Sequence, residues 1–87
     1  MTLTVQTATY DGSTPITFTQ GYKLLYLDWN PFGGSSTLYY ENDDSVTLDD
    51  TVDLLVHSMG DAIEDGAVFQ FPLFLVGFFL YTIVVHN

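Results

Sequence analysis

The longest apolar segment of the chain runs from Ala67 to Val85 and contains no Asp, Glu, Lys or Arg. Hydrophobic residues occupy it on every face, so its periodicity does not separate a helix from strands. As one helix it would be roughly 28 Å long, close to the hydrocarbon thickness of a bilayer. Length therefore favours a C-terminal transmembrane helix. The residues expected to face lipid are Val68, Phe69, Phe71, Leu73, Phe74, Leu75, Val76, Phe78, Phe79, Leu80, Ile83, Val84 and Val85.

The same segment has an alternative interpretation as two buried strands or a core helix inside a protein assembly. It is rich in Phe and Val, which suit strands, and Pro72 and Gly77 could separate one strand from the next. Under this alternative the segment is buried between neighbouring subunits. A single strand of this length would be abnormal, and for this reason the membrane helix is the expected structure.

Residues 49–65 carry apolar side chains at a helical spacing. Positions 52, 55, 56, 59 and 63 are apolar and would share one face of a helix, while acidic residues and His57 would lie on the other. Gly66 follows as a plausible C-terminal stop. The pattern predicts an amphipathic helix that packs its apolar face on the preceding strands.

The first half of the chain shows the two-residue alternation of strands. It predicts strands at residues 2–10, 16–20, 22–29 and 37–40, with residues 45–48 as a fifth strand or the lead into the helix. Short turns between them imply antiparallel pairing. The predicted fold class is α+β. Its parts are a small antiparallel β domain over residues 1–48, the amphipathic helix over 49–65 and a C-terminal membrane-anchor segment over 66–87.

The charge balance narrows the choice of partners. The chain has 11 Asp and Glu against a single Lys or Arg, which gives a formal net charge of −10. Such a surface repels phosphate backbones, so we expect no nucleic-acid partner. An acidic composition with almost no Lys and abundant Thr is also similar to that of proteins from high-salt organisms. Concentrated salt would screen the self-repulsion of the folded chain.

Residues that could carry chemistry are few. Residues Glu41 to Asp53 include the six carboxylates of Glu41, Asp43, Asp44, Asp49, Asp50 and Asp53, which make a weak divalent-cation site conceivable, but their spacing matches no calcium loop. A solvated acidic face is the simpler interpretation. The chain has no cysteine, and His57 and His86 lack a second ligand at metal spacing. No nucleophile elbow or phosphate-binding loop is present. We expect a protein that is not an enzyme and holds no cofactor.

Aromatic residues are abundant in the predicted β domain. Such side chains are ordinary in β cores, but they also dominate subunit interfaces. The core interpretation accounts for about half of them, and the remainder would need a neighbour. The candidate interface residues are Tyr22, Tyr26, Trp29, Phe32, Tyr39 and Tyr40.

These features together predict a non-enzymatic structural protein, anchored in a membrane by its C-terminal helix, whose acidic β domain docks onto a larger assembly. In general build the chain is similar to the small membrane-associated components of icosahedral virions with internal membranes. That likeness implies a location within a virion, between a protein shell and a lipid bilayer. Two alternatives stay open: a soluble capsid, tail or accessory subunit with its apolar segment buried between neighbouring subunits, and an accessory subunit of a membrane enzyme complex.

Overall fold

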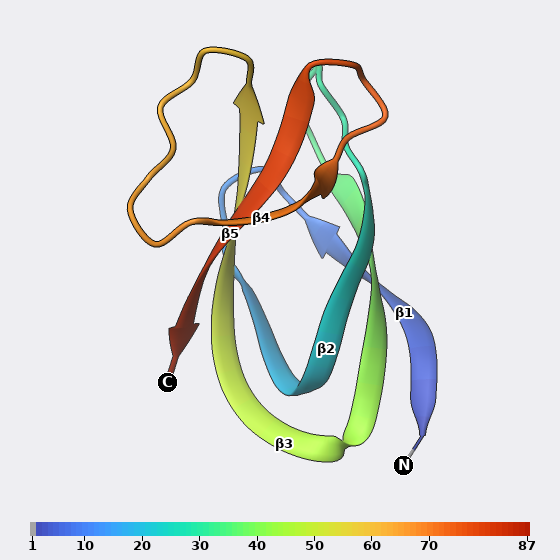
Figure 1. The fold of residues 1–87 in the computed structure, drawn as a ribbon. Helices are drawn as coiled ribbons and strands as arrows, with labels where there is room; N and C mark the ends of the chain where they lie inside the picture. The colour runs from blue at the N-terminus through green and yellow to red at the C-terminus, as the bar shows by residue number, and fades with distance from the viewer. Residues whose placement is uncertain (1) are drawn as a thin grey trace.

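The computed structural model describes residues 2–87 and shows a protein built from strands (Figure 1). The five strands are β1 (Leu3–Tyr10), β2 (Ile16–Asp28), β3 (Ser36–Ser58), β4 (Val68–Pro72) and β5 (Phe78–His86). Residues 2–87 contain no helix, so the predicted α+β class is wrong. The strands expected at residues 2–10, 16–20, 22–29 and 37–40 are present, but they merge into longer ones.

The strand β3 is the centre of the sheet. It is 23 residues long, and β2 pairs with it along one edge while β1 and β5 pair with successive parts of the other edge. All of these pairings are antiparallel, and β4 is added outside β5. The boundary expected at residue 48 falls inside β3. The sheet therefore runs without interruption from the N-terminal half of the chain to the apolar C-terminal segment.

A sharp bend divides the sheet into two halves, and β3 runs through both of them. Gln20 pairs with Thr47 but the next residue, Gly21, pairs with Asp43, which leaves a bulge of three residues in β3. Figure 1 shows β2 and β3 turning together at the bottom of the molecule. A Cβ atom at residue 21 would lie only 3.0 Å from the Cβ atom of Val46. Glycine is therefore the residue that allows the two bent strands to approach this closely.

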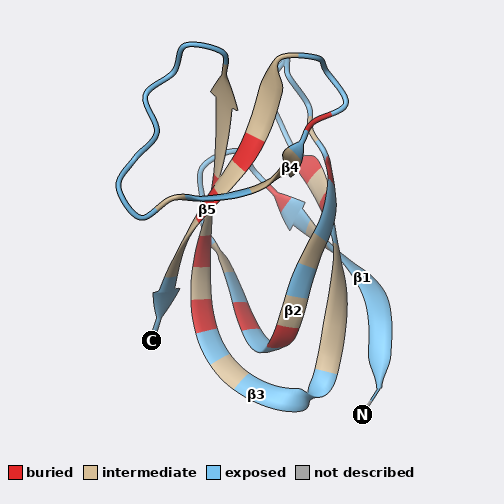
Figure 2. Cartoon of the chain, viewed as in Figure 1, coloured by how far each residue is buried: buried red, intermediate tan, exposed pale blue. Residues whose placement is uncertain are grey.

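The bend folds the sheet into a half-barrel with the core between its two halves. Figure 2 shows the buried positions along β2, β3 and β5, on the concave side of the sheet. The Tyr10 hydroxyl donates a hydrogen bond of 3.2 Å to the Leu54 carbonyl and so joins the end of β1 to the second half of β3. The buried hydrophobic residues are Tyr10, Phe18, Leu27, Leu38, Val52, Leu54, Leu73 and Leu80.

The amphipathic helix expected at residues 49–65 is wrong. Residues up to Ser58 continue β3, and a loop follows them. Val52 and Leu54 point into the core, whereas Leu55 and His57 point outward. Apolar residues on both sides of a strand produce matches at helical spacings by coincidence. Leu54, which the helical pattern leaves on the polar face, is buried because the true period is two.

The transmembrane helix expected at residues 66–87 is also wrong, and so is the membrane anchor built on it. The segment forms the hairpin β4–β5, in which Pro72 ends the first strand and Gly77, with φ of 89°, precedes the second. The Leu73 N–H donates to the Phe78 carbonyl at 2.9 Å and closes the turn. Within residues 2–87 we find no helix whose length and hydrophobicity would let it cross a bilayer.

Candidate functional site

The strand β5 divides the apolar C-terminal segment between two faces of the sheet. Leu80 and Thr82 lie on the concave side and are buried, opposite Val56 and Leu54 of β3. The side chains of β5 that alternate with these two point outward, because successive side chains of a strand point to opposite faces. The strand β5 thus places part of the predicted lipid-facing segment in the core of this chain and part of it on the outer side of the sheet.

The outward residues of β5 join those of its neighbours in one apolar surface. Tyr81 is paired with Leu55 of β3 on one side and with Phe69 of β4 on the other. Phe69 is 50% exposed and Val85 53%. We call this surface the β5 face, and its members are Leu55, Phe69, Phe79, Tyr81, Ile83 and Val85.

Aromatic contacts order the upper part of the β5 face. The ring of Phe69 lies 5.5 Å from that of Tyr81 and 6.5 Å from that of Phe79, measured between ring centroids. The His57 imidazole meets the Tyr81 ring edge-on at 5.6 Å. Edge-on and tilted contacts are the favourable arrangements of such rings. The rings therefore support one another sideways, and Phe69 remains exposed while Phe79 and Tyr81 are half-buried.

An ion pair fixes the loop at the margin of the β5 face. His57 Nε2 lies 2.8 Å from a carboxylate oxygen of Glu64, and Asp61 lies 3.6 Å from the other ring nitrogen. The hydrogen bond to Glu64 raises the pKa of His57, and the same bond lowers the pKa of Glu64. The loop between β3 and β4 is thus attached to the outer side of the sheet by charge.

We expect this clamp to make stability fall with rising pH. A raised pKa in the folded state means that the contribution of His57 is complete below its unfolded pKa of about 6.5. It is lost as the pH rises through the higher folded value. Thermal unfolding from about pH 6 to 9 should show the midpoint of the wild type approaching that of His57→Gln. Parallel midpoint curves for the two proteins would contradict the clamp, and Glu64→Gln should behave like the His57 variant.

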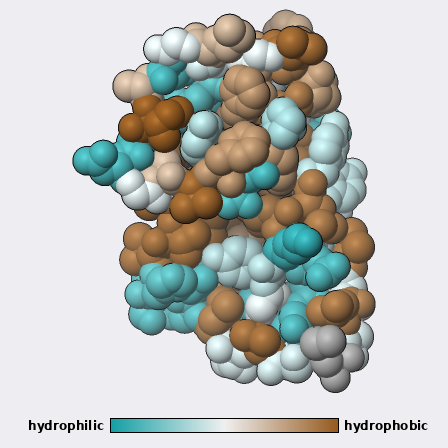
Figure 3. Space-filling view, viewed as in Figure 1, coloured by the Kyte–Doolittle hydropathy of each residue, from teal (hydrophilic) through white to brown (hydrophobic). Residues whose placement is uncertain are grey.

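The turn of the β4–β5 hairpin adds a second apolar feature. Phe74, Leu75 and Val76 are exposed, with Val76 at 94%. Met59 lies beside them, because its N–H donates to the Gly77 carbonyl at 3.2 Å. Figure 3 shows hydrophobic residues at the upper right, where this turn lies, and in a band across the middle of the same side. Apolar surface therefore extends beyond the β5 face to one end of the molecule.

The predicted aromatic interface is divided by the fold. Tyr22, Trp29 and Tyr40 are half-buried and pack against the core, as the 4.2 Å stacking of Tyr22 on Phe18 shows. The remaining candidates are exposed on the convex side or at a loop tip, and these are Tyr26, Tyr39 and Phe32. Tyr26 and Tyr39 contact each other at 5.9 Å. The structure does not gather the six residues into one surface.

The predicted lipid-facing residues are likewise distributed over several environments. Leu73 and Leu80 are buried, and Phe71, Phe78 and Val84 are half-buried against the core. Phe69, Phe79, Ile83 and Val85 belong to the β5 face. The remaining residues of the prediction, which are exposed, are Val68, Phe74, Leu75 and Val76. Leu55 and Tyr81 were missed as site residues, although an alternation test over residues 78–86 would have shown the outward position of Tyr81.

The acidic segment does not assemble into a metal site. Within residues 2–87 no group of three or more His, Asp or Glu side chains is arranged to hold an ion. Asp50 is buried instead, and it accepts hydrogen bonds from Tyr22 at 2.8 Å and from His86 at 2.6 Å. The bond to His86 lowers the pKa of Asp50. The geometry thus gives no support to the divalent-cation hypothesis.

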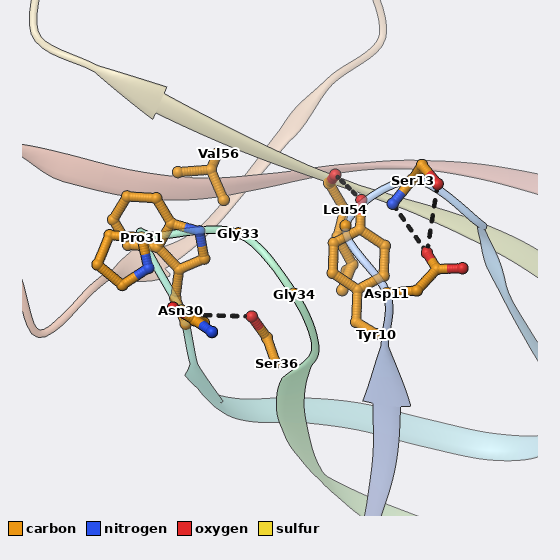
Figure 4. A pocket seen from close by; sticks show the side chains of 12 residues that line it. Tyr10, Asp11, Ser13, Asn30, Pro31, Gly33, Gly34, Ser36, Leu54 and Val56 are labelled. Atoms are coloured by element: carbon orange, nitrogen blue, oxygen red, sulfur yellow. Dashed lines mark hydrogen bonds between the residues drawn. The ribbon is translucent and has the colours of Figure 1, made fainter.

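A cavity lies where the end of β1 meets the loop before β3 (Figure 4). It has a volume of about 540 Å³ and is lined on one side by Tyr10 and Asp11 and on the other by Trp29 and Asn30. Asp11 accepts hydrogen bonds from Ser13 and Thr14, which lower its pKa to about 2. Burial raises the pKa of Tyr10. The Tyr10 hydroxyl is bonded to the Leu54 carbonyl, and the Asp11 carboxylate is bonded to the turn residues Ser13 and Thr14.

A second cavity, of about 460 Å³, lies beside Asp50 and is lined also by Tyr22, Gln70 and Thr82. Gln70 donates to the Thr82 hydroxyl at 2.8 Å, and the Tyr22 hydroxyl is committed to Asp50, with its pKa raised by burial. The polar groups are thus engaged within the chain. The β5 face, by contrast, is a contiguous apolar surface in which Phe69 and Val85 are exposed and the other members are half-buried. No family model matches the chain, and comparisons with curated proteins and with solved structures gave no match either.

Proposed function

We propose that this protein is a non-enzymatic structural subunit that packs its β5 face against the β5 face of a second copy in a larger protein assembly. Shells and tails of virions are the class of assembly to which this build is suited, and a location in a virion is part of the proposal. The proposal does not include a bilayer anchor. The observation that carries the proposal is the uncovered outer side of the hairpin β4–β5 and its neighbour β3.

The composition of the β5 face favours a protein partner. Six apolar or aromatic side chains lie together on it, and contiguous apolar surface of this kind usually marks an interaction site. The charged or titratable residues on this side of the second half of β3 are Asp49, Asp53 and His57. Covering the aromatic centre with another apolar surface removes it from water, which is the main driving force of association.

The net charge of the chain makes the association of two copies depend on salt concentration. Each chain carries −10, so two copies repel each other in dilute salt. At about 1 M salt the screening length falls to about 3 Å, and the repulsion between charges outside the contact becomes small. A two-fold pairing leaves the acidic loops at the periphery and brings the Asp53 carboxylates, which lie opposite Ile83 on each face, close to the contact. We therefore expect association in concentrated salt.

The test is a comparison of molecular mass in solution at about 1 M salt, by sedimentation velocity and light scattering. Ile83→Lys should reduce the mass of the associated species, because it places a strongly hydrated ammonium group, next to Asp53 on the paired strand, in a contact that is otherwise mostly apolar. Leu25→Lys is the matched control, since Leu25 is an exposed apolar residue of β2. Both variants lower the net negative charge equally, so a difference between them is not a charge effect.

The mass of Leu25→Lys should equal that of the wild type. If Ile83→Lys also retains the wild-type mass, the β5 face is not the contact and the proposal fails. A wild type that is monomeric at about 1 M salt would overturn it as well. Circular dichroism of both variants should show the β-sheet signal of the wild type, which verifies that each remains folded.

A further inference from the structure

The strand β1 presents an unprotected edge. It pairs with β3 alone, in a continuous register from Leu3 opposite Asp43 to Tyr10 opposite Ser36. Its sequence, LTVQTATY, contains no charge, proline or glycine. Val5 is 67% exposed. A flat, neutral edge strand of this length is a template for pairing with another strand.

The other free edges of the sheet carry features that oppose such pairing. The register of β2 shifts at the bend and again between Leu24 and Tyr26, and the strand contains Lys23. The strand β4 is five residues long, shifts register after Phe69 and ends at Pro72. Bulges, short length, lysine and proline are the usual protections of sheet edges. β1 has none of these protections.

The pairing of β1 with β3 determines which backbone groups are free. Asp44 donates its N–H to the Thr2 carbonyl, so the pair formed by residues 2 and 44 is a hydrogen-bonded one. In an antiparallel ladder such pairs alternate with pairs that are not hydrogen-bonded. The N–H and C=O groups of Leu3, Val5, Thr7 and Thr9 therefore point away from β3. These groups form the donor and acceptor row that a new strand would meet.

We propose that β1 pairs antiparallel with β1 of a second copy and so joins the two sheets across a two-fold axis at Gln6. This register keeps the whole strand paired and sets Leu3 opposite Thr9 and Val5 opposite Thr7 of the second copy. Each outward N–H then meets an outward C=O. The exposed Leu3 and Val5 side chains gain neighbours on the convex side of the joined sheet.

The free edge of β1 is suited to binding a second copy of this chain. A two-fold axis requires a surface that complements itself, and a neutral strand with alternating donors and acceptors does so when it is reversed. The remaining edges of the chain lack this regularity. The edge contact does not depend on the proposed β5 face contact. With both contacts present, each subunit has two different two-fold contacts, and the assembly can grow beyond a dimer.

The test uses the Ile83→Lys variant, in which the β5 face is blocked, so that the two contacts are examined separately. At about 1 M salt we expect this variant to be a dimer by sedimentation velocity. Adding Thr7→Pro should lower its mass to about half, because the lost N–H is one that points to the second copy and not to β3. The double change Val5→Lys and Thr7→Lys should do the same, since it sets lysines opposite each other.

Cross-linking tests the register. The chain has no cysteine, so Gln6→Cys introduces a single thiol on the axis. The two Cα atoms there would be about 4.5 Å apart, within the range of a disulfide. Mild oxidation should link this variant, whereas Thr19→Cys, exposed on β2, should stay unlinked. The proposal is overturned if Ile83→Lys is a monomer, if both edge variants remain dimers, or if the two cysteine variants link equally.

Discussion

Replacing Phe18 with alanine is expected to lower the free energy of unfolding by about 3–5 kcal/mol. The Phe18 ring is 5% exposed, stacks on Tyr22 at 4.2 Å and meets Tyr40 edge-on at 5.0 Å. It lies in β2 just before the bend, so its loss leaves a cavity where the two halves of the sheet come together. Chemical denaturation at fixed salt measures the effect.

The matched control is Phe32→Ala. This ring is 95% exposed at the tip of the loop before β3, so its removal should change the free energy of unfolding by no more than about 0.5 kcal/mol. If the wild type has a stability near the lower limit for a small domain, about 5 kcal/mol, the Phe18 variant would retain only about 0–2 kcal/mol, and up to about half of it would be unfolded. Equal losses for the two variants would contradict the position of Phe18 in the core.

Leu80→Ala is expected to cost about 2–5 kcal/mol of unfolding free energy. Leu80 is fully buried opposite Val56, and β5 lies between β3 and β4, so the surrounding strands cannot easily close the cavity. The same denaturation experiment measures it. We expect this loss because Leu80 belongs to the part of the apolar segment that is buried in the core of its own chain.

Val85→Ala distinguishes a strand from a helix in this segment. Val85 lies on the same strand but on the β5 face and is 53% exposed, so its truncation should cost much less than that of Leu80 in the monomer. The comparison is made in dilute salt, where we expect charge repulsion to keep the chain monomeric. A large loss for Val85 together with a small one for Leu80 would mean that the register between β3 and β5 is not the one described.

The acidic residues make the stability of the chain depend on salt concentration. Asp11, Asp43 and Asp61 each accept hydrogen bonds from nearby serine or threonine groups, in turns for Asp11 and Asp61 and at the bulge of β3 for Asp43, and these bonds lower the pKa of their carboxyl groups. They therefore stay charged well below neutral pH and sustain the repulsion within the chain. Salt concentration has to be held constant in comparisons of stability, because screening changes the free energy of the folded state.

The expected and observed structures differ where the sequence has apolar residues on both sides of a strand. In the segment around Thr4 and Val5, one face is polar enough for the two-residue alternation to be visible, and the strand was predicted correctly. Between Leu54 and Val56 both faces are apolar, so strand and helix patterns match equally well. The same ambiguity at Phe78 to Val85 led to the transmembrane helix. Local periodicity carries no information when the second face is also apolar.

The candidate site was predictable in part. An apolar segment that requires a neighbour was evident between Ala67 and Val85, and burial between subunits was the alternative interpretation of it. Which of its residues would lie outward depended on pairing with residues 50–58, more than twenty positions upstream. Whether β1 would be left at a free edge depended in the same way on how the other strands of the sheet pair with one another.

The sequence by itself determined the charge of the chain, its lack of cysteine, the strands of its first half and the presence of more apolar surface than a small domain can enclose. The tertiary structure alone decided that β3 bends at residues 44–46, opposite Gly21 of β2, that β1 and β5 share one edge of β3, and that Leu80 is fully buried while Ile83 is only half-buried. The physical reason is that burial is a property of pairs of strands. A residue becomes core or surface according to the partner that lies across from it, and that partner is distant in the chain.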